Sequence, residues 1–449
     1  MGDRLFRTGG TTVPAATPQI ARQAFSNIFA DMKYRNLVAR LSTFWLVLRR
    51  RFRDKGLIWA ITGMVKRVAA EILWIALLPA TALGHVMGFR CLNVRVEHIG
   101  HLAVEPDTLL KEAKLGKLSY KRWILIAPTG QVANDHLLSY WRPWFITVTS
   151  PAACWLLSIM SKHWLMQADV SRYVGKFFGA QDVYAVNAQW GDRPAVLALT
   201  EEDEDWGRNK LLELGVPAGS WFVAVHVREG GFLPHNEIIQ HHRNAHIENT
   251  FLAMQEIVKR GGTCIRMGDP SMTPLPKMPG VIDYAVHPLK SARMDVFLCA
   301  QARFFLGCTS GLAFLAATFG VPVAHANMIP VETLGIRHCD LSIPKLLWDT
   351  RLERYLSFPE VFEQGHSGYF FSQQYADAGI RVDENSADDI LDLVVEMLSR
   401  LDGKHVETEE DSALQAAYKG LFRSGHYSWG ATSRICTAYL RHHRGLLIQ

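Results

Sequence analysis

Residues 303–324 read RFFLGCTSGLAFLAATFGVPVA, and this stretch decides the fold. Residues 303–308 are mostly apolar and predict a buried strand, and residues 321–324 predict a second one. Between them, 312–319 form an apolar run that Gly320 closes, which is typical of a short helix. A strand, a helix and a strand at this spacing predict a right-handed βαβ unit, and therefore a parallel sheet.

The same alternation extends in both directions along the chain. Towards the C-terminal side of the body, strands are predicted at 222–226, 263–266 and 281–285, with helices at 247–260, 292–302 and 388–400. Nearer the N-terminus, strands are predicted at 92–97, 123–127 and 145–149, with helices at 102–113, 132–141 and 152–162. An acidic run at 201–205 and the turn residues 217–219 mark a polar junction between the two groups.

These patterns predict an α/β protein with two Rossmann-like domains that face a cleft, and a helical N-terminal extension. The expected boundaries are 1–90 for a basic and apolar helical arm, 91–215 for the first domain, 216–400 for the second and 401–449 for helices that pack back.

Composition excludes several classes of protein. With 49% hydrophobic and 20% charged residues, the 449-residue chain is neither disordered nor collagen-like. Its seven cysteines are scattered without a CxxC pair, which argues for a reducing, cytoplasmic compartment. Residues 1–90 hold 14 Lys and Arg against 4 Asp and Glu, so the remaining residues carry a net charge of −5. A slightly acidic body predicts no nucleic-acid partner.

The basic N-terminal arm suggests a membrane surface. Apolar patches flank a basic cluster from Arg49 to Arg67, and residues 72–89 form an 18-residue run without Asp, Glu, Lys or Arg. That run only reaches the lower limit for a spanning helix, and Pro79 interrupts it. The arm is therefore expected to lie on an anionic membrane, which makes the protein peripheral on the inner face of the cell membrane. A helical hairpin docked on the body is the alternative.

The predicted strand ends of the second domain carry an unusual set of polar residues. Ligands bind beyond the carboxyl ends of the strands in an open parallel sheet. The residues expected at that edge are His226, Arg228, Arg266, Gly268, Asp269, Thr309, Ser310, Gly311 and Asn327. Arginines, hydroxyls and helix N-terminal amides on one edge predict an anion site suited to a diphosphate. Alternatively, the arginines pair with Glu229 and Asp269, and residues 309–311 form an ordinary helix cap.

Candidate proton acceptors lie in both predicted domains. His101 follows the first strand-to-helix turn and faces the expected cleft, and Glu229 follows Arg228. Asn134, Asp135 and His136 form a rival group on the acceptor side. His242 and His246 stand four residues apart, but no third ligand follows at a usual spacing, so no metal site is predicted. The aromatic residues Trp141, Trp144, Phe145 and Trp155 fit either sugar stacking or the core.

Taken together, these motifs resemble a family of bacterial glycosyltransferases from surface-polysaccharide loci. The resemblance covers roughly residues 91–330. It is carried by the strings at 100–102, 226–228, 242–245, 266–270 and 309–312. The element His226-Val227-Arg228 is also distantly similar to the HxR element of the α1,6- and protein O-fucosyltransferase group. Glu229 departs from that group's pattern, which puts GDP-fucose as the donor in doubt.

The resemblance implies a GT-B fold, with the nucleotide-sugar donor in the C-terminal domain and a glycan or lipid-linked acceptor in the N-terminal one. It implies no metal or other cofactor, and it adds Arg243 and Asn244 to the donor-binding residues. Arg228 and Arg266 would hold the diphosphate, Asp269 and Asn327 would reach the sugar or ribose, and His101 or Glu229 would act as the base. A nucleotide-sugar 2-epimerase and a non-catalytic glycan- or nucleotide-binding assembly factor remain the alternatives.

Overall fold

The structure, a computed structural model, describes residues 62–63, 65, 68–120, 122–163, 165–174, 182–230 and 239–447. Its contacts divide the chain into two units, residues 1–76 and 77–449. The basic residues predicted for the arm, from Arg49 to Arg67, lie outside the described part of the chain. Among the described residues, no single helix is long and apolar enough to cross a membrane. The helices Val68–Ala76 and Leu78–Val86 meet that test only as a broken pair.

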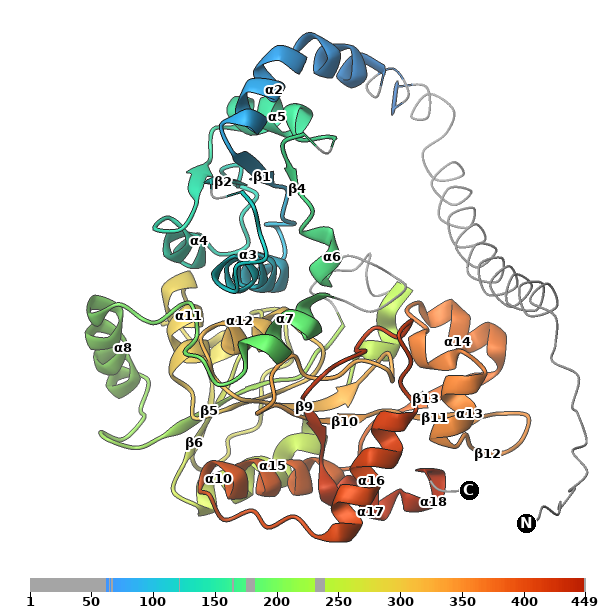
Figure 1. Cartoon of the computed structure of the whole chain (residues 1–449). Coiled ribbons are helices and arrows are strands. Elements are labelled where there is room, and N and C mark those ends of the chain that lie inside the picture. Colours follow the sequence, from blue (N-terminus) through green and yellow to red (C-terminus); the bar gives the residue numbers. More distant parts are fainter. Residues whose placement is uncertain are drawn as a thin grey trace, which may run out of the picture. The chain divides into compact units, whose positions relative to one another are not determined.

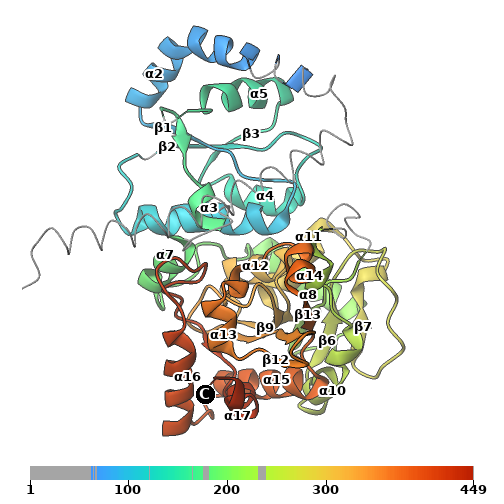
Figure 2. The same cartoon turned by 90° about the vertical axis from the view of Figure 1, so that its right-hand side faces the viewer.

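A small parallel sheet opens the second unit (Figure 1). Its order is β3-β2-β1-β4, from Ile146–Val148, Arg122–Ile126, Phe89–Leu92 and Gln167–Ala168. The helices of this region are α2 Leu78–Val86, α3 Ile99–Lys114, α4 Asp135–Trp141, α5 Pro151–Met160, α6 Ser171–Val174, α7 Asp182–Trp190 and α8 Glu201–Glu213. Figures 1 and 2 show α2 and α5 on one face of the sheet and α3 and α4 on the other.

The prediction of a strand at 92–97 was wrong, because β1 ends at Leu92. Its neighbours β2 and β4 pair with Leu92 through Leu125 and Ala168 and continue for at most one more residue. Val94 and Val96 are nevertheless buried on alternate positions. The alternating pattern therefore predicted correctly which residues are buried. It did not predict a strand correctly, because neither β2 nor β4 pairs with β1 beyond Leu92.

A seven-stranded parallel sheet forms the larger part of the unit. Its order is β14-β10-β9-β8-β5-β6-β7, from Arg434–Ile435, Leu341–Pro344, Val323–Met328, Phe305–Gly307, Phe222–His226, Thr263–Arg266 and Val281–Asp283. Every pairing in it is parallel. The predicted strands at 222–226 and 263–266 are confirmed with the same bounds. The described part of the chain is thus a mixed α/β structure with two parallel sheets.

Short helices and a third sheet complete this part. The antiparallel sheet β12-β11-β13 joins Arg354–Tyr355, Leu346–Asp349 and Ile380–Asp383. The helices are η1 His241–Arg243, η2 Ile247–Thr250, α10 Phe251–Lys259, η3 Tyr284–Val286, α11 Ala292–Gln301, α12 Gly311–Thr318, α13 Phe358–Glu363, η4 His366–Gly368, α14 Ser372–Ala378, α15 Ala387–Leu401, α16 Glu409–Gly420, α17 Thr437–His442 and α18 Arg444–Leu447.

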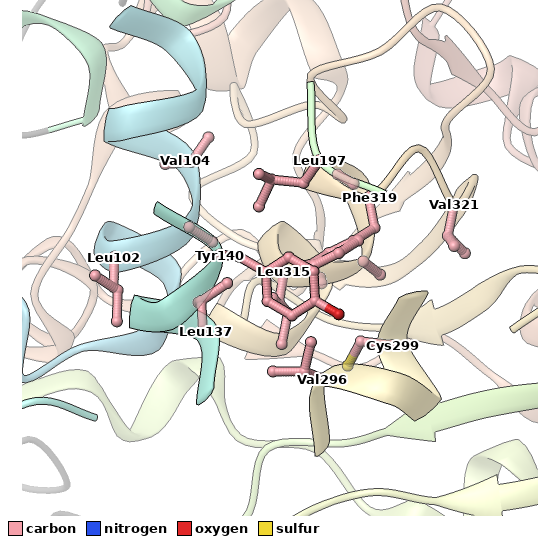
Figure 3. Close-up of a cluster of buried hydrophobic side chains, with 14 of the residues drawn as sticks. Leu102, Val104, Leu137, Tyr140, Leu197, Val296, Cys299, Leu315, Phe319 and Val321 are labelled. Atoms are coloured by element: carbon pink, nitrogen blue, oxygen red, sulfur yellow. The ribbon is translucent and has the colours of Figure 1, made fainter. Parts of the chain in front are cut away.

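An apolar core joins the two parallel sheets. Leu102, Leu137 and Tyr140 from α3 and α4 belong to the same buried cluster as Val296 and Leu315 from α11 and α12 (Figure 3). Burial of such surface contributes about 25 cal/mol per Å². Because this core is continuous, the contacts group residues from 77 onward as one compact unit, and an arrangement of two separate domains is not confirmed.

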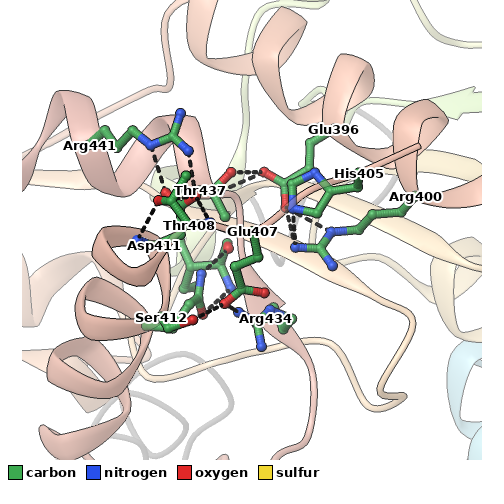
Figure 4. A network of polar contacts seen from close by, with 12 residues as sticks. Glu396, Arg400, His405, Glu407, Thr408, Asp411, Ser412, Arg434, Thr437 and Arg441 are labelled. Atoms are coloured by element: carbon green, nitrogen blue, oxygen red, sulfur yellow. Dashed lines mark hydrogen bonds and ion pairs between the residues drawn. The ribbon is translucent and has the colours of Figure 1, made fainter. Parts of the chain in front are cut away.

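Charged side chains attach the C-terminal helices to this body (Figure 4). Thr437 donates to buried Glu396 on α15 through its backbone N–H at 2.6 Å and its hydroxyl at 2.7 Å. Arg441 donates from Nε to Asp411 on α16 at 2.6 Å. Within the C-terminal region, β14 pairs with β10 and forms an edge strand of the large sheet.

The N-termini of α3 and α12 touch through two glycines. A Cβ atom on Gly100 would lie 2.8 Å from the Cα atom of Gly311, and one on Gly311 would lie 2.9 Å from the backbone nitrogen of Gly100. Since real Cβ atoms do not approach backbone so closely, only glycine at both positions allows the two helix ends to meet.

Gly100→Ala is therefore expected to destabilise the protein. The added methyl group would force α3 away from α12, and overpacking of this kind costs about 1–3 kcal/mol in the free energy of unfolding. Urea denaturation would measure the loss. Gly420→Ala is the matched control, because Gly420 also lies in a helix but has no atom within 4 Å of the added Cβ. Equal stability of the two variants would contradict the close contact.

Candidate functional site

The carboxyl ends of β5, β6 and β8 lie along one edge of the large sheet. The register pairs Val225 with Arg266 and His226 with Gly307, so the loops that follow these strands begin side by side. Parallel strands place all such loops at the same edge, where ligands bind in open α/β sheets. The predicted site residues that follow β5, β6 and β8 are therefore brought to one edge.

Arg243 is the centre of a positively charged group at this edge. Its NH1 donates to Gln240 Oε1 at 2.8 Å, its NH2 donates to the backbone oxygen of Thr309, and its Nε has no partner among the described residues. Both partners are neutral oxygens. Burial, and then the positive charge of Arg228, lower the pKa of Arg243 to about 10. Two guanidinium groups whose charges act on each other favour a bound anion, and we call Arg228 and Arg243 the arginine pair.

The N-terminus of α12 adds further donors to the same group. Ser310 is the N-cap residue, but its side chain makes no capping hydrogen bond. Its buried Oγ has no partner in the described part of the chain. The Thr309 hydroxyl donates instead to the backbone oxygen of Ile329 at 3.2 Å. Ser310 therefore differs from an ordinary cap, and its hydroxyl and the helix dipole remain for an anion.

Across the glycine contact, His101 and Glu105 form a dyad in the first turns of α3. The Nδ1 atom of His101 lies 2.6 Å from Oε1 of Glu105, which is buried, whereas the side chain of His101 is 22% exposed. Burial raises the pKa of Glu105, and the hydrogen bond from His101 acts in the opposite direction. A carboxylate on Nδ1 fixes the orientation of the ring, so Nε2 is the nitrogen left to accept a proton.

Tyr427 is a partly buried tyrosine whose backbone N–H donates to Glu332 at 3.0 Å and whose ring packs edge-on against Tyr184. Burial raises its pKa to about 12, the charge of Arg243 lowers it, and the charges of Glu332 and Glu105 raise it. Sequence reasoning missed Tyr427 and Glu105. The four-residue spacing from His101 to Glu105 could have revealed the carboxylate, whereas no sequence signal points to Tyr427.

Arg266 has a different environment from the one predicted. Its side chain is fully buried, and it contacts Glu229 at 2.7 Å and Asp283 at 3.0 Å. It also donates to the backbone oxygen of Thr273 at 3.2 Å. The alternative that Arg266 pairs with Glu229 therefore describes the structure, together with an aspartate from β7 that the sequence did not indicate. This network holds Glu229 in place and leaves Arg266 away from solvent.

Other predicted donor residues bond within the protein. Asp269 accepts the backbone N–H of Ser271 at 2.9 Å and closes the turn that begins at Gly268. Asn327 accepts the backbone N–H of Asn385 at 2.8 Å. His226 lies with Nδ1 3.2 Å from the backbone oxygen of Met267, and burial lowers its pKa to about 4.

The predicted acceptor-side residues tie helices together. Asn134 caps α4 by accepting the backbone N–H of Leu137 at 2.8 Å, and its Nδ2 donates to the backbone oxygen of Ala292 on α11 at 2.9 Å. His136 lies 2.9 Å from Asp203 on α8. The remaining member, Asp135, is exposed in the first turn of α4.

A pocket of about 400 Å³ opens beside the arginine pair. It is lined by Glu229, Gly230, His241, His242, Asn244, Ala245, His246, Lys345, Val382 and Glu384.

Two buried side chains in this pocket were not predicted to bind a ligand. Lys345 donates from Nζ to the backbone oxygens of Asn244 at 2.6 Å and His242 at 3.1 Å, and burial lowers its pKa. His242 contacts Ser372 through Nδ1 at 2.8 Å, and its buried Nε2 has no partner among the described residues. Burial lowers the pKa of His242 to about 3, so its ring is neutral at physiological pH. Lys345 follows β10, more than 100 residues from His242, so sequence gave no sign of their proximity.

The two histidines considered as metal ligands do not share a helix face. The 3₁₀ turn η1 ends at Arg243, and His246 lies beyond it, with Nδ1 2.8 Å from Glu384. No group of three His, Cys, Asp or Glu side chains arranged to hold a metal ion is found in the described ranges.

Comparisons with known proteins give little further information. No protein-family model matches the sequence, and no curated protein matches it either. Among solved structures, the chain is similar to a glycosyl transferase family 9 protein from Veillonella parvula, with 11% sequence identity and a TM-score of 0.23. The match covers 48% of this chain and 59% of the other. This likeness is too weak to carry an argument about fold or function.

Proposed function

We propose that the protein is a glycosyltransferase that moves a sugar from a nucleotide-sugar donor to a glycan or glycolipid acceptor. The observation that carries the proposal is the environment of Arg243. It is a desolvated guanidinium beside Arg228, it contacts only neutral oxygens among the described residues, and it lies at the N-terminus of α12. Such a group fits the diphosphate of a nucleotide donor.

In this proposal Arg228, Arg243, Ser310 and the Gly311 amide stabilise the leaving nucleoside diphosphate. Positive side chains and a helix dipole stabilise charge that develops on a leaving phosphate, as a divalent cation does in other enzymes. The proposal is therefore that no metal is required. The adjacent pocket, with Lys345 at its wall, would hold the nucleoside part of the donor.

His101 is the proposed general base for an inverting transfer. Its Nε2 would take the proton of the acceptor hydroxyl as that oxygen attacks the anomeric carbon. The bond from that carbon to the phosphate oxygen breaks, and its electron pair leaves with the nucleoside diphosphate. Glu105 orients the ring and stabilises the imidazolium that forms. Glu229 is the weaker candidate, because Arg266 holds its carboxylate. A retaining transfer would need no such base.

The acceptor would approach from the side of the smaller sheet, which supplies His101. A membrane-linked acceptor in surface-polysaccharide synthesis, met on the inner face of the cell membrane, fits the basic N-terminal arm.

A thermal-shift screen tests the donor site. The UDP, GDP, CMP, dTDP and ADP forms of nucleotides and nucleotide sugars would be added to the full chain, once with EDTA and once with magnesium. One series should raise the melting temperature in both conditions, because a ligand that binds only the folded state stabilises it. The Arg243→Gln substitution should lower the affinity for that ligand by about 10- to 100-fold, since it removes a charge-assisted hydrogen bond.

Arg208→Gln is the matched control for the loss of one positive charge. Arg208 lies on α8 with its side chain 58% exposed and pairs only with Glu204 and Asp205 among the described residues. The Arg208→Gln variant should bind the donor with the same affinity as the native chain. Stabilisation by no series, or equal stabilisation of the Arg243→Gln variant, would contradict the proposed donor site.

A further inference from the structure

The outer face of the smaller sheet is covered by two helices with exposed apolar side chains. On α2 and just after it, Leu83, Val86 and Met87 are 61%, 82% and 49% exposed. On α5, Trp155 and Leu156 are 60% and 38% exposed. Figures 1 and 2 both show α2 and α5 side by side on the face that points away from α3. We call these five residues the outer face.

Helix α5 shares a small core with the sheet, and α2 approaches Met166 of that core at Gly84. Cys91 and Ile126 point from β1 and β2 towards α5, where Cys154 and the partly buried Leu157 meet them. The neighbours of those two strand residues, Leu92 and Leu125, point into the main core on the other side. Since α5 already buries one stripe, the apolar residues on its opposite stripe are available for a partner.

The composition of these helices is unusual for a surface exposed to water. A surface helix of a globular protein carries charged residues on its outer stripe. Helix α5 reads PAACWLLSIM and α2 reads LPATALGHV, and neither contains a charged residue other than one histidine. Single exposed apolar residues are common, but a contiguous group of them indicates an interaction site.

The charge around the outer face indicates what kind of partner it fits. The chain segments that build this face carry Arg90 and Lys162, and no Asp or Glu lies within 77–96 or 143–168. Glu97 and Asp169 follow these segments directly, and Arg95 pairs with Glu97 at 3.8 Å. Trp, Leu and Met beside positive charge match the acyl boundary and the negative headgroups of an anionic bilayer.

We propose that the outer face docks on an anionic lipid bilayer, with α2 and α5 lying in the plane of the interface. Helix α2 lies within residues 1–90, which the sequence already predicts to lie on a membrane, whereas α5 adds a second helix from outside that segment. The proposal does not depend on the transferase activity. Docking through this face would keep the smaller sheet, which carries His101 on its opposite side, near a membrane-linked acceptor, and this consequence rests on the proposed function.

Site-specific fluorescence on the full chain tests this proposal. Leu83→Cys and Leu156→Cys would each carry a polarity-sensitive dye, and the labelled native chain would report any background from Cys339, the cysteine that is not buried. The controls are Leu212→Cys and Leu401→Cys, which lie on α8 and α15 with matched exposures of 54% and 37%. Vesicles would contain phosphatidylcholine alone or an equimolar mixture with phosphatidylglycerol.

The dyes at positions 83 and 156 should shift to shorter wavelength with the anionic vesicles, and the dyes at 212 and 401 should not. Shifts at 83 and 156 without shifts at 212 and 401 would show that the outer face itself contacts the bilayer, even if the first 76 residues also bind the vesicles. No shift at 83 and 156, or an equal shift at all four positions, would overturn the proposal. A shift that appears without vesicles and grows with protein concentration would also overturn it, in favour of a second copy of the chain.

A sedimentation assay gives an independent measure. Leu83→Glu with Leu156→Glu should lower binding to the anionic vesicles by roughly tenfold or more, because two carboxylates would enter the interface. Leu212→Glu with Leu401→Glu adds the same charge elsewhere and should bind like the native chain. Equal binding by the two double variants would overturn the proposal. Neither assay contains a donor nucleotide, so failure here is distinguishable from failure of the proposed donor site.

Discussion

Replacing His101 with alanine is expected to lower the rate of sugar transfer by about 10²- to 10⁴-fold, which is the range for loss of a general base. Donor affinity should stay unchanged, because His101 belongs to α3 and the proposed phosphate ligands follow β5 and β8. Initial rates at saturating donor, together with thermal shift by the donor, would separate the two effects. Glu105→Gln should give a smaller loss of rate, since the ring remains but its orienting carboxylate is gone.

His98→Ala is the control for this prediction. His98 lies in the same turn, with its ring centre 5.8 Å from that of His101, but its Nε2 contacts Arg95 at 3.1 Å and not a buried carboxylate. This variant should keep most of the activity. Full activity of the His101→Ala variant would remove His101 from the chemistry and favour either Glu229 or a retaining reaction.

The second large effect concerns stability. Arg266→Met is expected to lower the free energy of unfolding by about 3–5 kcal/mol, the range observed when one partner of a buried ion pair is removed. Glu229 and Asp283 would then face an apolar side chain, although both carboxylates are largely shielded from water. Urea denaturation monitored by circular dichroism would measure the change.

Arg260→Met provides the comparison at a nearby surface position. Arg260 pairs with Glu256 on α10 at 2.7 Å with its side chain 36% exposed, so its loss should cost less than about 1 kcal/mol. If the Arg266→Met variant unfolds like the native chain yet loses donor binding, Arg266 would be the phosphate ligand that the sequence predicted. In that case the ion pairs of Arg266 with Glu229 and Asp283 would not be needed for the stability of the fold.

Local pattern predicted the large sheet well. The strands at 222–226 and 263–266 have the predicted bounds because continuous apolar runs between turn residues suit strands buried on both faces. The helix predicted at 247–260 begins as the 3₁₀ turn η2 and continues as α10 to Lys259. Strand β1 was misplaced because residues 93–97 alternate like a strand but have no neighbour with which to form a ladder.

The candidate site shows the same difference between what local pattern predicts and what depends on long-range pairing. The edge that gathers Arg228 and Ser310 followed from parallel topology, because strand ends of a parallel sheet must meet. Arg243 lies on η1 and was expected there only from the family resemblance. What sequence could not supply was pairing over long separations. Asp283 pairs with Arg266, and Lys345 reaches the backbone oxygens of His242 and Asn244, through contacts that depend on the packed structure. Only the folded arrangement distinguishes a desolvated arginine without a carboxylate from one that is already paired.

One measurement tests the central claim most directly. The full chain would be incubated with the donor found by thermal shift and a membrane glycolipid extract, in EDTA, and the nucleoside diphosphate and the sugar would be followed separately. We predict that the native chain releases nucleoside diphosphate in equal amount to the sugar that enters the glycolipid, and that the Arg243→Gln variant releases far less. Donor that binds but stays intact would contradict this account and indicate a binding protein. Nucleoside diphosphate released with the sugar rearranged and no acceptor modified would instead indicate an epimerase.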